Sequence, residues 1–314
     1  MLSEMQTEWS DANGNVDIDG MRRKYLRQLA ELTGRNVVAY QTDWMKPGVG
    51  NDASINLYDV QGLMEVFRDL DTSKGLDLVL NSPGGDPTAA DSLVAYMREK
   101  FDDVRVLVPV AAMSAATMWS LAADRIVMGR HSQLGPVDPQ LSMSGGSIPA
   151  GAITRGFARA QAECSADPTQ LSAWVPTLQQ YFPGLLELCE DASRLSKELV
   201  EQYLVSYMLK DQTDGRLLAA AAAEFFADDQ RHIAHGRRIG RTQLRDLGLT
   251  VDFLEEDPAL QNALLSTHHA YTHSFAMSGA VKIIENHIGR TWVRTAPMQI
   301  PMMPQMVLPN ASSF

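Results

Sequence analysis

Two short motifs in the first half of the chain contain residue types that suit a nucleophilic site. Ser82-Pro83-Gly84-Gly85 follows an apolar run at 76–80, and Ser114 lies in a small-residue stretch at 111–116. A serine hydroxyl can attack a carbonyl carbon when a base accepts its proton. Backbone N–H groups at a glycine turn and at a helix start can stabilise the oxyanion that forms. Each motif alone is commonplace, but together they predict acyl-transfer chemistry at Ser114.

The segments around these motifs alternate between β and α patterns. Strands are predicted at 76–80, 104–110 and 125–128, with helices at 88–100 and 117–123, and a further strand and helix precede them at 36–41 and 55–70. Such alternation predicts a parallel sheet covered by helices. Turns that follow adjacent parallel strands lie at the same sheet edge. The amides of Gly85, 29 residues before Ser114, and Ala115 are therefore expected to converge on one oxyanion.

These motifs resemble the Clp-type serine proteases and signal peptide peptidase A, and above all the serine dehydrogenase proteinase family. Further matching segments are Leu134-Gly135-Pro136-Val137-Asp138-Pro139-Gln140, Ser196-Lys197-Glu198-Leu199-Val200 and the histidine-rich stretch at 268–273. The resemblance covers roughly residues 21–293. It implies an α/β, Clp/crotonase-like fold of repeated β-α units with a helical C-terminal region. It also implies a serine endopeptidase that acts on peptides or proteins and assembles into a homo-oligomeric ring.

The expected organisation is a flexible N-terminus (1–20), a protease domain (21–294) and a Met- and Pro-rich flexible tail (295–314). The domain divides into a core at 34–140 and a helical extension at 152–275. Between them, the Ser- and Gly-rich stretch at 142–151 is expected to be a solvated linker or a loop that lines the substrate site. Proline residues are expected to interrupt the chain near 168 and 176.

The resemblance assigns roles to the residues around Ser114. Gly85 and Ala115 would form the oxyanion hole, while Gly84 and Pro136 would bind substrate, with an extended peptide adding as a strand beside the glycine pair. Asp138 is held rigidly between Val137 and Pro139, and either caps the following turn or lines the site.

Two residues are candidates for the base that activates Ser114. Clp-type proteases have a histidine near the position of 136–138, where this chain has none; His131, 17 residues after Ser114, is the nearest. Signal peptide peptidase A uses a Ser–Lys dyad, and the first lysine after Ser114 is Lys197, between Leu195 and Leu199. An apolar setting favours a neutral amine, which can accept a proton. Lys197 is therefore the predicted base, with His131 as the alternative.

Other chemically active residues have weaker patterns. His269 and His273 are four residues apart beside His268, but nothing near them completes a zinc site, so no metal is predicted. A packing or subunit-interface role is expected for these three histidines. His232 and His235 lie in a basic turn and are expected to face solvent. No GxGxxG motif follows a strand, so neither dehydrogenase chemistry nor a cofactor is predicted.

Composition sets outer limits on function. The chain has 314 residues, 45% of them hydrophobic and 21% charged, as is ordinary for a globular protein. A net charge of −11 argues against a nucleic-acid binder. The two cysteines, an acidic start and the lack of a long apolar run favour a cytoplasmic enzyme without a transmembrane segment.

Two other functions fit the same motifs. A crotonase-like acyl-coenzyme A enzyme would use the two amides without a serine nucleophile. A catalytically inactive scaffold or binding protein would explain the missing histidine and would be indifferent to Ser114→Ala, apart from any effect on assembly.

Overall fold

A computed structural model describes residue 9, residues 16–143 and residues 146–296 of the chain. Most of the expected flexible start and nearly all of the Met- and Pro-rich tail lie outside these residues. The division into a domain with a core and an extension stays a prediction.

A seven-stranded, mostly parallel sheet forms the centre, in the order β11-β10-β1-β2-β3-β5-β9. Neighbours from β1 to β9 are parallel, whereas β10 is antiparallel to both β1 and β11. Its strands are β1 (Asn36–Thr42), β2 (Leu76–Asn81), β3 (Val104–Val108), β5 (Arg125–Met128), β9 (Val251–Phe253), β10 (Ala280–Asn286) and β11 (Thr291–Thr295). The predicted fold class is confirmed.

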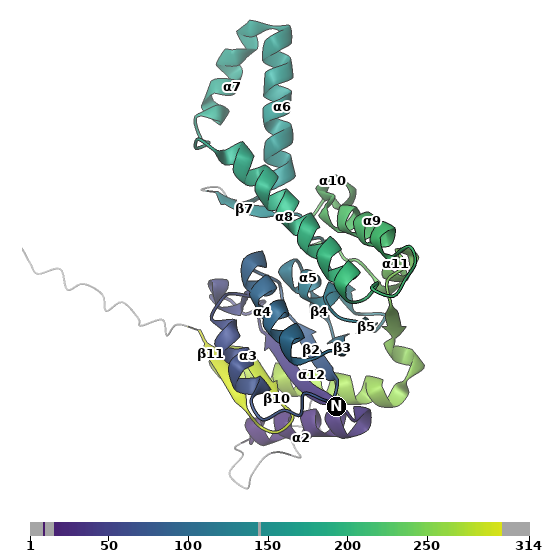
Figure 1. Cartoon of the computed structure of the whole chain (residues 1–314). Coiled ribbons are helices and arrows are strands. Elements are labelled where there is room, and N and C mark those ends of the chain that lie inside the picture. The colour runs from purple at the N-terminus through teal and green to yellow at the C-terminus, as the bar shows by residue number, and fades with distance from the viewer. Residues whose placement is uncertain (1–8, 10–15, 144–145, 297–314) are drawn as a thin grey trace, which may run out of the picture.

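Helices cover both faces of this sheet (Figure 1). On one face lie α2 (Ile18–Thr33) and α12 (Pro258–Met277); on the other lie α3 (Asp59–Phe67), α4 (Pro87–Lys100) and α5 (Ala115–Leu121). Alternate strand residues supply the two cores: Val38 and Tyr40 pack with the second group of helices, and Val37 and Ala39 with the first. Because both faces of the sheet are covered, central strands such as β1 are buried along their whole length and mainly apolar.

The helical extension has two parts. An arm of α6 (Ala150–Ala166), α7 (Leu171–Leu178) and the start of α8 (Leu185–Ser206) projects from the body (Figure 1). The second half of α8 packs on α9 (Gly215–Ala227) and returns to the main core through Leu199, Val200 and Leu204. Two short helices follow, α10 (Asp229–His232) and α11 (Arg241–Asp246).

Several local predictions were wrong. The described residues of the stretch at 142–151 do not form a linker: they belong to the antiparallel strands β7 (Gln140–Met143) and β8 (Gly146–Pro149) and to the start of α6. Pro176 lies inside α7 instead of ending it. The sheet also includes β9 and β10, which the local pattern did not predict; β9 pairs with the distant β5, and β10 lies between the distant β1 and the neighbouring β11.

Candidate active site

Ser114 occupies a strained turn between β4 (Ala111–Ala112) and α5. Its backbone has φ 52° and ψ −120°, a conformation that costs a non-glycine residue about 1–3 kcal/mol. Its side chain is half-buried, and the seven residues that follow it are fully buried. Strain of this kind at an accessible hydroxyl is typical of a functional position.

The glycine turn lies directly against Ser114. A parallel bridge joins Ser82 to Ala112, with the Ser82 N–H donating to the Ala111 carbonyl at 2.9 Å. A Cβ on Gly84 would lie 2.4 Å from the Met113 carbonyl oxygen and 2.8 Å from the Ser114 Cβ. Gly84 also has φ 93°, so only glycine fits here. The two turns therefore converge, as the parallel sheet predicts.

At this junction the backbone N–H groups of Gly85 and Ala115 point away from the turn and the helix to which they belong. The Gly84 carbonyl accepts the Ile55 N–H at 2.7 Å, and a trans peptide directs the Gly85 N–H the opposite way. The Ser114 carbonyl accepts from Met118 at 3.1 Å, so the Ala115 N–H points out of the helix start. Within the described parts of the chain, neither N–H has an acceptor.

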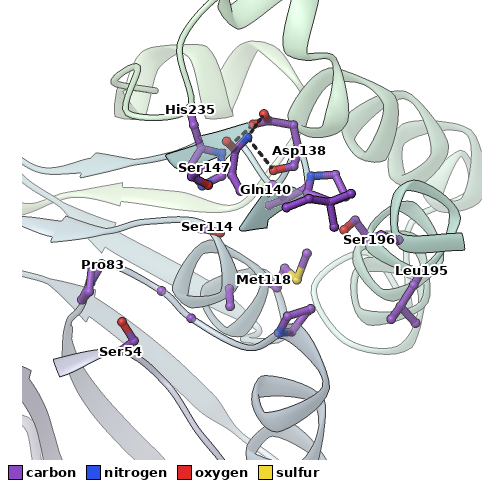
Figure 2. Close-up of a pocket in the computed structure, with 18 residues that line it drawn as sticks. Ser54, Pro83, Ser114, Met118, Asp138, Gln140, Ser147, Leu195, Ser196 and His235 are labelled. Carbon is purple, nitrogen blue, oxygen red and sulfur yellow. Dashed lines mark hydrogen bonds and ion pairs between the residues drawn. The ribbon is translucent and has the colours of Figure 1, made fainter. Parts of the chain in front are cut away.

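A cavity of about 450 Å³ opens over Ser114, which is a usual size for a ligand site. Figure 2 shows Ser114 between the glycine turn, helix α8 and the segment that bears Asp138 and Gln140. Its lining is mainly apolar and comprises Ser54, Pro83, Gly84, Gly85, Pro87, Ser114, Ala115, Met118, Val137, Asp138, Pro139, Gln140, Leu141, Ser147, Ala192, Leu195, Ser196 and His235. Only two of these side chains titrate, Asp138 and His235.

Asp138 and His235 form a polar pair on the cavity wall. The His235 Nδ1 lies 2.8 Å from the Asp138 Oδ1, and the Gln140 amide donates to the Asp138 Oδ2 at 2.6 Å. Asp138 is only 4% exposed, and His235 is 30% exposed. Of the two roles left open for Asp138, the structure thus supports the one at the site. His235, which was expected to face solvent, is partly buried and faces the cavity.

Backbone contacts join the segment that carries Asp138, at the end of the core, to the segment of the extension that carries His235. The Val137 N–H donates to the Phe226 carbonyl at 2.8 Å, and Leu134 and Ile239 exchange both backbone hydrogen bonds. His232, also expected in solvent, is buried, with its Nε2 2.6 Å from the Phe225 carbonyl oxygen. The loop that carries His235 is therefore anchored on both sides.

Lys197 has a different environment from the one predicted. Its ammonium donates to both carboxylate oxygens of Glu224, at 2.7 and 2.8 Å, and its side chain is 39% exposed. It lines a separate, charged pocket with Arg194 and Glu198. Leu195 and Ser196 take the cavity side of α8, so the expected apolar setting of Lys197 is absent. The Ser–Lys dyad stays a prediction that would require this side chain to leave Glu224.

The remaining predicted residues are placed as follows. Gly84, Gly85 and Ala115 line the cavity with Ser114, whereas Pro136 is buried and only its neighbours Val137 to Pro139 reach the cavity. His131 is exposed and lies over Gly129, outside the cavity.

His268 belongs to a different pocket, which Thr42 and Asn81 also line. Its Nδ1 lies 3.0 Å from the Gln41 Oε1, and burial lowers its pKa to about 4. The neighbouring charges of His269 and His131 act in the same direction. His268 is thus a packed, neutral histidine at ordinary pH.

The described residues offer neither a metal site nor a membrane-spanning helix. No cluster of three or more His, Cys, Asp or Glu side chains in them could hold a metal ion. In the same part of the chain, no helix has the length and apolarity to cross a bilayer.

Sequence reasoning missed His235 as a cavity residue. His235 lies 121 residues after Ser114 in a turn rich in arginine, and nothing in its local pattern separates it from a surface histidine. Its partner Asp138 is 97 positions away in the chain, so a local pattern does not connect the two residues.

Comparisons with known proteins give the same assignment at family level. The model for ClpP-like SDH-type serine proteinase matches residues 18–254. Two uncharacterized proteins of Methanocaldococcus jannaschii are similar: one is 31% identical over 191 residues, the other 28% identical over 141. These matches cover 57% and 44% of this chain but only 65% and 47% of the relatives' own lengths.

Two solved structures are also similar, both of variants of the 1510-N membrane-bound stomatin-specific protease. One, in complex with a substrate peptide, has a TM-score of 0.34 and covers 56% of this chain and 59% of its own. The other has a TM-score of 0.38 and covers 63% and 74%. Both are 17% identical to this chain.

Proposed function

Because this chain belongs to the ClpP-like family of SDH-type serine proteinases, we propose that it is a serine peptidase that forms its acyl-enzyme on Ser114. The family match covers three quarters of the chain and supports serine protease chemistry. The role of Ser114 and the nature of the substrate are part of the proposal.

The reaction begins when the Ser114 Oγ attacks the carbonyl carbon of a peptide bond and loses its proton to a base. The resulting oxyanion accepts hydrogen bonds from the Gly85 and Ala115 N–H groups. The C–N bond then breaks, the amine leaves with a proton, and water hydrolyses the ester to release the acid. Donors fixed before the reaction are effective because they need no reorganisation when charge develops.

The observation that carries this proposal is that the Gly85 and Ala115 N–H groups, beside Ser114, have no acceptor among the residues that the structure describes. They come from two turns that meet only because Gly84 has no side chain. Ala115 is buried, and a buried backbone N–H without an acceptor is unusual because it forfeits a hydrogen bond, whereas Gly85 is exposed. The presence of these N–H groups beside a strained, accessible serine favours a site built for a transient oxyanion.

The substrate is proposed to be an extended peptide with apolar side chains. Ile55 already pairs with Gly84 and Asp86 on one edge of the glycine turn, so a substrate strand would add at the opposite edge, on the Ser114 side. Met118, Val137 and Leu195 would contact its side chains. Gly84 is part of this platform, and the substrate-contact role predicted for Pro136 moves to its neighbours.

Lys197 is the base that the sequence predicts, and it remains testable as such. It would need to exchange its two hydrogen bonds with Glu224 for one with Ser114. The variant Lys197→Ala therefore belongs in the first experiment.

A homo-oligomer is also part of the proposal. Leu171, Val175 and Phe182 are exposed on the projecting arm, where a second copy would bury them. Light scattering coupled to size exclusion would measure the assembly, and a monomer at micromolar concentration would argue against it.

The test is labelling with a fluorophosphonate probe followed by peptide mapping, on wild type, Ser114→Ala and Lys197→Ala. We expect one label on Ser114, no label in Ser114→Ala, and parallel loss of cleavage of dye-labelled casein. Absence of label and cleavage in every assembly state would reject the peptidase. A thioester substrate assay would then separate an acyl-coenzyme A enzyme from a scaffold.

A further inference from the structure

The cavity over Ser114 contains a proton acceptor that the sequence did not identify. Among the 18 residues that line it, only Asp138 and His235 have an ionisable side chain. The other polar groups, Ser54, Gln140, Ser147 and Ser196, are poor bases at neutral pH. A serine nucleophile requires a base within hydrogen-bond reach or one water away.

We propose that His235 is the general base and acid for Ser114, and that Asp138 is its positioning residue. The inference rests on the proposed peptidase function and replaces Lys197 in the proton-transfer role.

The hydrogen bond between the two residues determines which imidazole nitrogen is available. The Nδ1 of His235 faces the Asp138 carboxylate at 2.8 Å, and a carboxylate is an acceptor, so Nδ1 carries the proton. The Nε2 then holds the lone pair, and within the described residues it has no hydrogen-bond partner. A neutral imidazole oriented in this way is the form that accepts a serine proton.

The carboxylate itself is held in place. Gln140 donates to the Asp138 Oδ2, which leaves Oδ1 for His235. Because Asp138 is almost completely buried, its charge is little screened and stabilises the imidazolium that forms during attack. The anchors at Val137 and Ile239 fix both backbones, so this pair is present before substrate binds.

The rival base is occupied elsewhere. Lys197 binds Glu224 on the other side of α8, in a pocket without Ser114. Behind His235, Arg155 and Asp229 line an adjoining pocket and neutralise each other through two hydrogen bonds of 2.8 and 2.7 Å. Neither offers a free carboxylate or cation to compete for the imidazole.

The proton balance of the cycle is as follows. As the Ser114 Oγ bonds to the carbonyl carbon, its proton passes to the His235 Nε2, directly or through one water. His235 gives that proton to the leaving amine when the C–N bond breaks. Water then attacks the ester and gives a proton to Nε2, which returns it to the Ser114 Oγ as the acid leaves.

The experiment measures the rate constant for fluorophosphonate labelling of Ser114 and the cleavage of dye-labelled casein by the full chain. We expect His235→Gln to slow both by about 10²–10⁴-fold, with an unchanged melting temperature. The same substitution at His131, outside the cavity, should leave both rates unchanged. Added imidazole should restore part of the rate to His235→Ala but none to Ser114→Ala.

Asp138 is tested by conservative and non-conservative variants. Asp138→Asn should slow labelling at least tenfold because an amide does not fix the required tautomer, whereas Asp138→Glu should retain more of the rate at equal melting temperature. If the Asp138 carboxylate has only a structural role, the labelling rate should instead fall in proportion to the loss of melting temperature in both variants.

The outcomes separate this inference from the proposed function. If wild type labels and cleaves, but His235→Gln stays within about threefold of it, the histidine role is rejected and the peptidase stands. If labelling and cleavage instead slow sharply in Lys197→Ala, the Ser–Lys dyad predicted from the sequence replaces the proposed role of His235. If wild type neither labels nor cleaves, the proposed function fails, and this inference fails with it.

Discussion

Helix α8 presents two different surfaces within a few residues. Ala192, Leu195 and Ser196 line the cavity over Ser114, whereas Lys197 and Glu201 line a charged pocket on another side. Positions three and four apart share a face, and adjacent positions do not. Lys197 therefore lies in a segment that resembles the family but points away from the cavity that its neighbours Leu195 and Ser196 line.

The two polar pairs beside these surfaces differ in the same way. Asp138 is buried and pairs with His235 on the wall of the cavity that contains Ser114. Lys197 and Glu224 are both exposed to solvent where they pair. An exposed ion pair is worth about 0–1 kcal/mol and is screened by salt. A charged pair is therefore a candidate for proton transfer when it is buried and faces the cavity. The presence of charge alone does not distinguish it from a surface ion pair.

The largest effect is expected at the floor of the cavity. Gly84→Ala should reduce activity by at least about 10²-fold because the Cβ would displace Ser114 and Ala115 from the oxyanion site. It should also destabilise the fold by about 1–3 kcal/mol through overpacking, in addition to the positive-φ cost. Casein cleavage and denaturant unfolding measure the two effects.

Gly34→Ala is the matched control for this substitution. Gly34 also has a positive φ, 68°, but a Cβ there would meet nothing within 4 Å. It should cost about 1–2 kcal/mol and leave activity intact. Equal activity losses in both variants would mean that the contact with Ser114 has no special role.

A smaller effect is expected from the cavity face of α8. Leu195→Ala should lower kcat/KM for apolar peptides about tenfold, mostly by raising KM, because it removes apolar contact with the substrate. Glu201→Ala, on the charged side of the same helix, should change neither constant. Steady-state kinetics on a peptide series would test this, and similar constants for both variants would contradict the assignment of the faces.

A buried histidine away from the cavity should affect stability and not catalysis. The native pKa of His268 is about 4, below the usual value of 6.5. Between these two pH values the unfolded chain binds a proton at His268 that the native protein does not. The contribution of His268 to the free energy of unfolding is therefore fully present above pH 6.5 and is lost as the pH falls toward 4. Urea unfolding of wild type and His268→Gln across this range should show a flatter pH dependence in the variant, and parallel curves would count against it.

The smallest effect is expected at the exposed pair. Lys197→Ala should change the casein cleavage rate less than threefold and stability by less than about 1 kcal/mol. Glu224→Gln is the matched control, since it breaks the same ion pair without touching the lysine. A hundredfold loss in Lys197→Ala alone would restore the Ser–Lys dyad.

Local patterns were sufficient for the sheet and its first helices. Continuous apolar runs predicted β1, β2, β3 and β5, and Gly34 ends α2 as predicted, with its N–H donating to the Ala30 carbonyl. The family resemblance drawn from the two motifs is confirmed. The strands β9 and β10 were missed although β10 also pairs with the neighbouring β11; their contacts with β5 and β1 join residues more than 100 positions apart, which a local pattern does not reveal.

The sequence by itself determined the parallel core, the serine at a strand-to-helix turn and the glycine turn beside it, because each depends on short-range patterning. Only the tertiary structure decided which polar groups share the cavity. Asp138 and His235 are 97 residues apart and meet through contacts such as Leu134 with Ile239. Lys197 is turned away by the helical rotation between neighbouring residues, a difference of one position along the chain.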